Sequence, residues 1–282
     1  MNLQGMRLHF RRLSYQLGKP LTLGGRAYRL RGYCANRLAG TFEHELHMIP
    51  VLERVLGATT GAFVDVGVNV GQTLMKVLAI DPSRAYVGFE PQIECCFFVN
   101  QFLADNALGH ARVIALALSN ENRICSLFSN SSYDDMASIS GASDCTGQIR
   151  RFSTLVPARV GDEALEEIGL RNIGVIKIDV EGAELNVLSG LVKVLSTQRP
   201  VVIFEVLPNF FGEDRVMLDP TNCARNSATA NKIYDLLETA GYRISQIDER
   251  GDEREIDGFD LDDRQKYVGH DFIARPLAQH SG

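Results

Sequence analysis

The sequence contains no long hydrophobic run. No stretch of about 18 apolar residues occurs in the 282-residue chain, so no helix is expected to span a membrane. The first residues also lack the apolar core of a signal peptide, because arginines are interspersed with leucines there. We therefore expect a cytoplasmic protein without a transmembrane segment.

The six cysteines show no metal-binding or redox spacing. Cys34, Cys125, Cys145 and Cys223 stand alone, and none of the six forms a C-x-x-C pair. The adjacent Cys95 and Cys96 lie in an apolar run and are expected in the core rather than at a metal. A reducing compartment fits this usage. The chain also lacks internal repeats and low-complexity tracts, and its length suits one sizeable domain with additions.

Acidic residues are missing from the N-terminal segment. No acidic residue precedes Glu43, whereas eight of the 29 basic residues do. The rest of the chain contains the other 21 basic residues and all 35 acidic residues, so its formal net charge is −14. Leucine, methionine and phenylalanine at helical spacing over residues 3–17 predict a basic amphipathic helix. A hairpin around Gly24-Gly25 is expected over residues 21–30. We expect an extension, 1–41, before the main domain, 42–282.

Two interpretations of this extension stay open. The helix would pack on the domain or on a second copy of the chain, as in a homo-oligomer. Alternatively, it would make peripheral contact with an anionic surface such as a membrane or a lipid-linked glycan. Nucleic acid is disfavoured as a partner, since the body of the protein is acidic and has no basic stripe with aromatic residues.

Residues 63–73, FVDVGVNVGQT, predict a buried strand, a glycine loop and the start of a helix over 72–80. Glycine permits positive φ and close approach of a ligand, and the helix start offers free N–H groups. We therefore assign Asp65, Gly67, Asn69 and Gly71 to a nucleotide-like cofactor. The spacing is G-x-N-x-G, not the dinucleotide G-x-G-x-x-G, and the lysine of a P-loop is absent. Glycines that serve only packing are the alternative.

A second strand, residues 86–90, ends in an acidic residue. Glu90 follows Asp65 by 25 positions, near the offset of about 20 at which a carboxylate reaches ribose hydroxyls in doubly wound folds. Glu90 and the adjoining Pro91 are therefore predicted to bind the cofactor. The alternative is a surface glutamate before a turn-forming proline.

Carboxylates crowd after two further predicted strands. Asp179, Glu181 and Glu184 follow the strand around 175–178, and Glu205 ends the strand 201–206. Carboxylates beside apolar elements are costly unless they bind something, although capping of a helix N-terminus is the alternative for Asp179 and Glu181.

The segments DVGVNVGQT, GFEPQ, ALALSN, IKIDVEGAE and IFEV, in this order, resemble the FkbM family of S-adenosylmethionine-dependent methyltransferases. The resemblance covers roughly residues 43–208 and departs at Val68, where alanine is more usual. It implies a class I, Rossmann-like methyltransferase fold that binds S-adenosyl-L-methionine. It also implies methyl transfer to a hydroxyl of a sugar or polyketide-like metabolite.

Other elements complete the expected architecture, an α/β sheet with helices on both faces. Helices are predicted at 42–56, 94–106, 185–195 and 231–240, and strands at 112–118 and 124–128. Strands 242–247 and 270–274 would form the C-terminal antiparallel hairpin, with a solvent-facing acidic loop, 248–263, between them. Ala117, Leu118 and Ser119 are predicted adenine contacts. Ser138, in the polar loop 129–147, is the predicted acceptor contact that the resemblance implies.

Deprotonation of an alcohol requires a base, which contributes roughly 10²–10⁴-fold. Asp179 is the first choice for base or acceptor orienter and Glu181 the second, while Glu205 would orient either. A divalent cation held by these carboxylates is an alternative, and we predict no metal because no histidine joins them. His44 and His47 are interpreted as surface or cleft-rim groups. Two other functions stay open: a nicotinamide-dependent enzyme, and a cofactor-binding module without turnover.

Overall fold

The computed structural model describes residues 19–30, 45–131, 134, 136–141, 149–211, 216–218, 220–261 and 270–278. The predicted helix over residues 3–17 lies outside these ranges, and the division at residue 41 stays a prediction. Within the part of the chain that is described, no helix has the length and apolar character that crossing a membrane requires.

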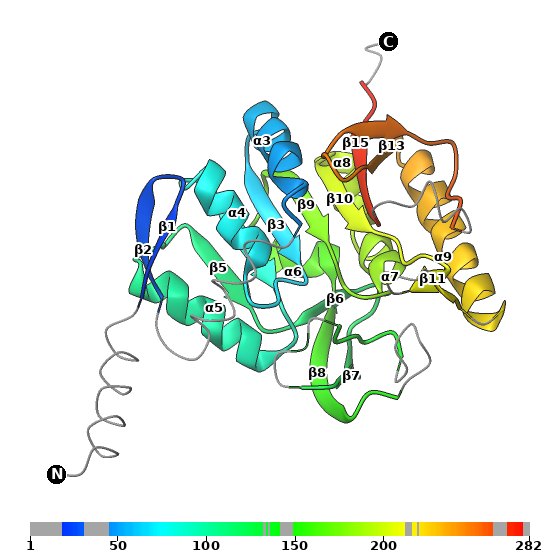
Figure 1. Ribbon diagram of the computed structural model, residues 1–282, viewed down its shortest axis with the longest axis horizontal. Coiled ribbons are helices and arrows are strands. Elements are labelled where there is room, and N and C mark those ends of the chain that lie inside the picture. The colour runs from blue at the N-terminus through cyan, green and yellow to red at the C-terminus, as the bar shows by residue number, and fades with distance from the viewer. Residues whose placement is uncertain are drawn as a thin grey trace.

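One eight-stranded sheet organises the molecule (Figure 1). Its order is β14-β13-β15-β10-β9-β3-β4-β5, in which β14 is Glu253–Glu255, and the strands from β10 to β5 run parallel. The parallel strands are β3 (Ala62–Val66), β4 (Tyr86–Phe89), β5 (Ala111–Ile114), β9 (Ile173–Ile178) and β10 (Val201–Glu205). Antiparallel pairing of β13 (Tyr242–Ile247) with β15 (Asp271–Pro276) confirms the predicted C-terminal hairpin, and β15 pairs with β10. The predicted class I methyltransferase sheet is confirmed.

Helices cover both faces of this sheet, as expected when parallel strands are buried on both sides. Phe63 of β3 belongs to a core with α3 (Met48–Ala58), α4 (Gln72–Ile80) and α5 (Ile93–Asp105). The next residue, Val64, points to the opposite core, which α6 (Gly161–Glu167), α7 (Glu184–Ser189), α8 (Val192–Thr197) and α9 (Pro220–Thr239) cover. Cys95 and Cys96 are buried in the first core, as predicted.

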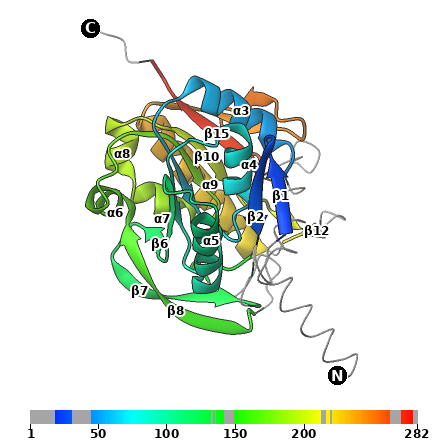
Figure 2. The same ribbon diagram turned by 90° about the vertical axis from the view of Figure 1, so that its left-hand side faces the viewer.

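The N-terminal hairpin packs on the main sheet's helices. β1 (Lys19–Leu23) and β2 (Arg26–Leu30) pair antiparallel, which confirms the predicted hairpin. Leu23, Tyr28 and Leu30 are buried in the core that α4 and α5 share. The described part of the extension is therefore docked on the domain (Figure 2).

A separate three-stranded sheet lies below the main one (Figure 2). It contains β6 (Ala117–Ser119), β7 (Arg123–Ser129) and β8 (Phe152–Val160). The predicted strand 124–128 is confirmed as β7. The predicted strand 112–118 is wrong in extent, because β5 ends at Ile114 and a tight turn directs the chain into β6. A short pair, β11 (Phe210–Phe211) and β12 (Val216–Met217), forms a separate two-stranded sheet.

The predicted helix 185–195 is two helices, α7 and α8, that Gly190 separates. A Cβ at Gly190 would lie 2.0 Å from the carbonyl oxygen of Ser119, so glycine is required for the backbones to pack this closely between the two helices. Asp162 then caps α8, because its two carboxylate oxygens accept the backbone N–H groups of Lys193 (2.8 Å) and Val194 (2.9 Å).

Two other predicted boundaries are wrong, and one predicted loop contains a strand. The first helix begins at Met48 rather than residue 42, since 45–47 form a turn in which Glu45 has φ 52°. The last predicted helix, 231–240, is the end of the longer α9. The acidic loop is partly structured, because β14 (Glu253–Glu255) pairs with β13 and Glu253 binds Arg275.

Gly67→Ala tests whether the glycine loop is fixed by close backbone packing. Gly67 has φ 92°, and a Cβ there would meet the carbonyl oxygen of Asp179 at 1.8 Å. Gly169→Ala is the control, since Gly169 has φ 69° with open space around it. Both substitutions strain the backbone, but only Gly67→Ala adds a clash. We expect it to lower the free energy of unfolding by roughly 1–3 kcal/mol more than the control in urea denaturation. Equal losses would contradict this packing.

Candidate active site

The carboxyl ends of the parallel strands open into one cavity of about 470 Å³. This volume falls within the range of roughly 300–1,000 Å³ that small-molecule and cofactor sites occupy. Most of the residues predicted for the site line it: Gly67, Asn69, Glu90, Pro91, Ala117, Leu118, Asp179, Glu181 and Glu205. Residues from the turn before α3 and from the start of β15 close the cavity on another side.

The glycine loop after β3 is shaped by positive φ angles. Gly67, Asn69 and Gly71 have φ of 92°, 48° and 95°. The Asn69 side chain fastens the loop, because its Oδ1 accepts the Val70 N–H at 2.6 Å and its Nδ2 donates to the Asp134 carbonyl at 3.2 Å. The loop is thereby held open toward the cavity at Gly67 and Asn69.

Glu90, which follows β4, is buried and lines the cavity. Its Oε2 accepts the Asn69 N–H and its Oε1 the Gln92 N–H, both at 2.7 Å. Burial raises the pKa of Glu90 to about 7, although these two N–H groups oppose the rise. A carboxylate offers about four lone-pair sites, so capacity for two hydroxyl donors is left.

Four predicted site residues do not line the cavity. Asp65 is fully buried and accepts the Tyr86 hydroxyl, and burial raises its pKa to about 6. Gly71 ends the loop as the residue just before α4, and Ser119 is fully buried beside Asn120. Ser138 is buried and donates to the Glu181 carbonyl at 2.8 Å, so it supports the acidic loop from behind.

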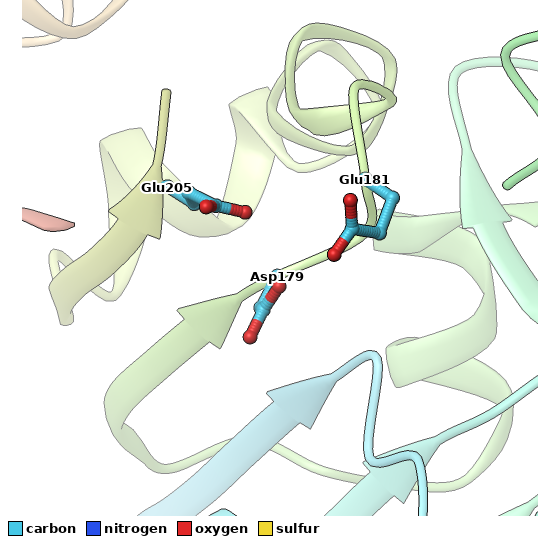
Figure 3. Close-up of side chains that lie close together, drawn as sticks. All are labelled: Asp179, Glu181 and Glu205. Atoms are coloured by element: carbon cyan, nitrogen blue, oxygen red, sulfur yellow. The ribbon is translucent and has the colours of Figure 1, made fainter. Parts of the chain in front are cut away.

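Asp179, Glu181 and Glu205 point toward one another (Figure 3). Asp179 follows β9, Glu205 ends β10, and a carboxylate oxygen from each lies within 4.8 Å of the others. Burial, with the charges of Asp179 and Glu181, holds the pKa of Glu205 well above its usual range. Glu184, which the sequence groups with them, instead accepts the backbone N–H groups of Val180 and Gly182.

The buried Lys177 balances this negative charge. Its Nζ lies 2.7 Å from Asp179 Oδ2, and its side chain is 6% exposed. Burial opposes its charge, but Asp179, Glu45 and Asp65 hold its pKa well above the usual range. The ammonium occupies one oxygen of Asp179, and the other carboxylate oxygens of the trio could accept a hydroxyl donor or hold a divalent cation. Sequence reasoning missed this role; the signal was a lysine inside an apolar strand.

Glu45 extends the charge network to the turn before α3. Its Oε2 lies 3.0 Å from the Nζ of the buried Lys76. Burial opposes ionisation, but Lys177 and Lys76 outweigh it and lower the pKa of Glu45 to about 2. Glu45 also lines the cavity, which sequence reasoning did not foresee.

His47 and Asp271 form a pair at the cavity. His47 Nε2 lies 2.8 Å from Asp271 Oδ2, and both residues line the cavity. The hydrogen bond to Asp271 is the main cause that raises the pKa of His47. The cleft-rim position interpreted for His47 fits this geometry, whereas its partner was not foreseen. His44 lies outside the described residues.

Three comparisons with known proteins identify what this chain is similar to. The family model described as the methyltransferase FkbM domain matches residues 65–244 of this chain. A comparison with curated proteins found no match. Solved structures that are similar include a methyltransferase FkbM from Methylobacillus flagellatus, with 14% identity and a TM-score of 0.42. That similarity covers 66% of this chain and 39% of the Methylobacillus chain, so this chain spans less than half of its length.

Another similar structure is the SAH-bound methyltransferase PaMTH1 from Podospora anserina, with 9% identity, a TM-score of 0.47, and coverage of 99% of this chain and 97% of that chain. A third is the plantazolicin methyltransferase BpumL in complex with SAH, with 11% identity and a TM-score of 0.41, covering 87% of this chain and 91% of that chain.

The raised pKa of Glu90 predicts a pH dependence of stability. A carboxyl whose pKa rises from 4.5 to about 7 on folding stabilises the protein below pH 4.5 and loses that contribution as pH rises to 7. Glu90→Gln removes this titration. Relative to wild type, the variant should therefore gain on the order of 1–3 kcal/mol of unfolding free energy between pH 5 and 8, since one pKa unit is about 1.4 kcal/mol.

Urea unfolding at the two pH values measures this difference in the protein without ligand. Glu94→Gln, at the exposed start of α5, is the control that removes a carboxylate outside the cavity. A wild-type-minus-variant difference for Glu90 that does not change with pH would contradict the raised pKa.

Proposed function

This chain belongs to the methyltransferase FkbM family, and we propose that it transfers the methyl group of S-adenosyl-L-methionine to a hydroxyl of a glycan or small metabolite. Family membership makes it a methyltransferase. That the methyl group goes to an oxygen atom, and that the acceptor is a glycan or small metabolite, is what we propose beyond family membership.

The cofactor half of the cavity fits S-adenosyl-L-methionine. The observation that carries this assignment is Glu90: a buried carboxylate beside the glycine loop, with free acceptor capacity for the two ribose hydroxyls. Gly67 and Asn69 would let the cofactor approach the backbone closely. Phe89, Leu118 and Leu127 supply apolar walls for the adenine ring. The bound cofactor supplies an electrophilic methyl group on sulfur.

The acceptor half of the cavity is rich in hydrogen-bond acceptors. Asp179, Glu181 and Glu205 converge there, so a molecule with several hydroxyl donors complements it (Figure 3). Asp179 is anchored through Oδ2 by Lys177, which leaves Oδ1 to orient the reacting hydroxyl. Placing that oxygen in line with the methyl group supplies much of the rate enhancement. The crowding of carboxylates therefore supports a polyhydroxylated acceptor.

The alternative functions make different predictions about the methyl group. A nicotinamide-dependent enzyme is disfavoured by the missing G-x-G-x-x-G and would transfer no methyl group. A cofactor-binding module without turnover would bind the cofactor and leave it intact. We also propose a reducing, cytoplasmic setting, in keeping with the absence of a disulfide among the described residues.

The proposal is tested by incubating the enzyme with ¹³C-methyl-labelled S-adenosylmethionine and a pool of monosaccharides and hydroxylated aromatic compounds. A new O-methyl carbon signal in the NMR spectrum is expected. A methyl signal on nitrogen, carbon or sulfur of the product would contradict O-methylation, and intact cofactor in every pool would favour the module without turnover.

Asp179→Asn separates catalysis from cofactor binding. The amide keeps the shape of the side chain but loses the ionised oxygens that orient the hydroxyl and bind Lys177. We expect kcat to fall by roughly 10²-fold or more while cofactor affinity stays near wild type. The melting temperature should also fall, because the buried Lys177 ammonium loses its charged partner. Asp235→Asn, on the exposed side of α9, is the matched control and should behave as wild type.

Two results would overturn the role of Asp179. Near-normal turnover would reduce it to a cap of the following loop, since asparagine caps nearly as well as aspartate. Loss of cofactor binding with normal folding would instead move Asp179 into the cofactor half of the cavity.

A further inference from the structure

His47 and Asp271 form a histidine–carboxylate pair that the proposed function does not yet use. The two residues are 224 positions apart, and His47 Nε2 meets Asp271 Oδ2 at 2.8 Å. The side chains are 21% and 17% exposed, and both line the cavity. The pair is therefore sheltered but open to a bound molecule.

Sheet topology places this pair beside the acceptor half. Asp271 begins β15, and its register partner on β10 is Glu205. β10 in turn pairs with β9, whose end carries Asp179. Since neighbouring strands lie about 4.8 Å apart, Asp271 is one strand beyond Glu205 and two beyond Asp179. Glu90 lies on the opposite side, after β4, so the pair is far from the ribose position.

The hydrogen bond fixes which nitrogen of His47 is basic. An ionised carboxylate only accepts hydrogen bonds, so Nε2 carries the proton that faces Asp271. In the neutral imidazole the lone pair is then on Nδ1, and the structure shows no hydrogen bond from a described residue to that atom. An imidazole oriented by a carboxylate through one nitrogen presents a base at the other.

The neighbouring carboxylates are less suited to accept a proton. Asp179 already binds Lys177 through Oδ2, and its ionised form is needed to hold that buried ammonium. Burial and the charges of Asp179 and Glu181 hold the pKa of Glu205 well above its usual range, which opposes the ionised form that a carboxylate base requires. Of the described residues lining this half of the cavity, His47 combines a free lone pair with an orienting partner.

We propose that His47 is the general base of methyl transfer and that Asp271 is its positioning residue, an inference that rests on the proposed O-methylation. The acceptor oxygen forms a bond to the methyl carbon with a lone pair, while the carbon–sulfur bond breaks and its electrons remain on sulfur. The hydroxyl proton passes to His47 Nδ1. The products are a methyl ether, S-adenosylhomocysteine and an imidazolium that Asp271 stabilises before the proton leaves to solvent.

The surroundings of His47 set the direction of the pH dependence. The hydrogen bond to Asp271 is the largest influence; together with the charges of Asp271 and Glu45 it raises the pKa of His47, while burial and Lys76 lower it. The net pKa is above the ordinary 6.5. Because only neutral imidazole accepts the proton, kcat should rise with pH through a midpoint above 6.5.

The test is a pH profile of kcat, measured with labelled S-adenosylmethionine and the pool of monosaccharides and hydroxylated aromatic compounds. His47→Gln should lower kcat by roughly 10²-fold or more and remove the rising limb. Asp271→Asn should shift that limb to lower pH and lower the plateau. His110→Gln, in the exposed turn before β5, is the control and should match wild type. Affinity for S-adenosylhomocysteine should stay within about threefold, or about 0.7 kcal/mol, in all three variants. The reason is that none of the three residues lies in the cofactor half of the cavity.

A readout without turnover guards against variants that misfold. The imidazole signal of His47 in wild-type protein bound to S-adenosylhomocysteine should titrate with a pKa above 6.5, and at the midpoint of the kcat profile. A kcat profile without a rising limb near that value would overturn the inference, as would unchanged turnover in folded His47→Gln. If wild-type enzyme transfers no methyl group at any pH, the proposed O-methylation itself fails.

Discussion

The arrangement of carboxylates at the carboxyl ends of the parallel strands depends on the buried ammonium of Lys177. It lies inside β9 among Asp179, Asp65 and Glu45, all of which hold its charge in place. Several carboxylates at the end of one sheet would repel one another in a medium of low polarity, and an unpaired buried charge is costly. The lysine lets Asp179 stay anchored and ionised while its second oxygen faces the cavity. Lys76 plays the same part for Glu45 at the turn before α3.

The cavity has two halves, and the order of the strands in the sheet decides which residues line each half. Glu90 and the glycine loop, after β4 and β3, form the half that suits a ribose and a nucleobase. Asp179, Glu205 and Asp271, at the ends of β9 and β10 and the start of β15, form the half that suits a hydroxylated acceptor. The antiparallel β15 matters here, because its first residue, not its last, lies at the same edge as the carboxyl ends of the parallel strands. A methyl group held between the halves would face the acceptor.

Local patterns in the sequence were sufficient for much of this arrangement. Buried strands rich in branched residues, followed by a glycine or an acid, predicted β3, β4, β9 and β10, and most of the residues predicted for the site do line the cavity. The errors arose where distant contacts decide local structure. Gly190 lies between α7 and α8 with the Ser119 carbonyl packed against it, and β8, which was not predicted, pairs with the distant β6 and β7. Likewise, no spacing rule joins His47 to Asp271 across most of the chain.

The cavity is proposed to hold a methionine-derived nucleoside through Glu90. Titration calorimetry of the wild-type protein and of Glu90→Ala, with S-adenosylhomocysteine and with NAD, measures this binding. The wild type should bind S-adenosylhomocysteine and not NAD. Glu90→Ala should weaken binding by about ten- to a hundredfold, because a hydrogen bond to a charged group contributes roughly 1.5–3 kcal/mol. Tight NAD binding without response to S-adenosylhomocysteine, or an unchanged dissociation constant in Glu90→Ala, would contradict this proposal.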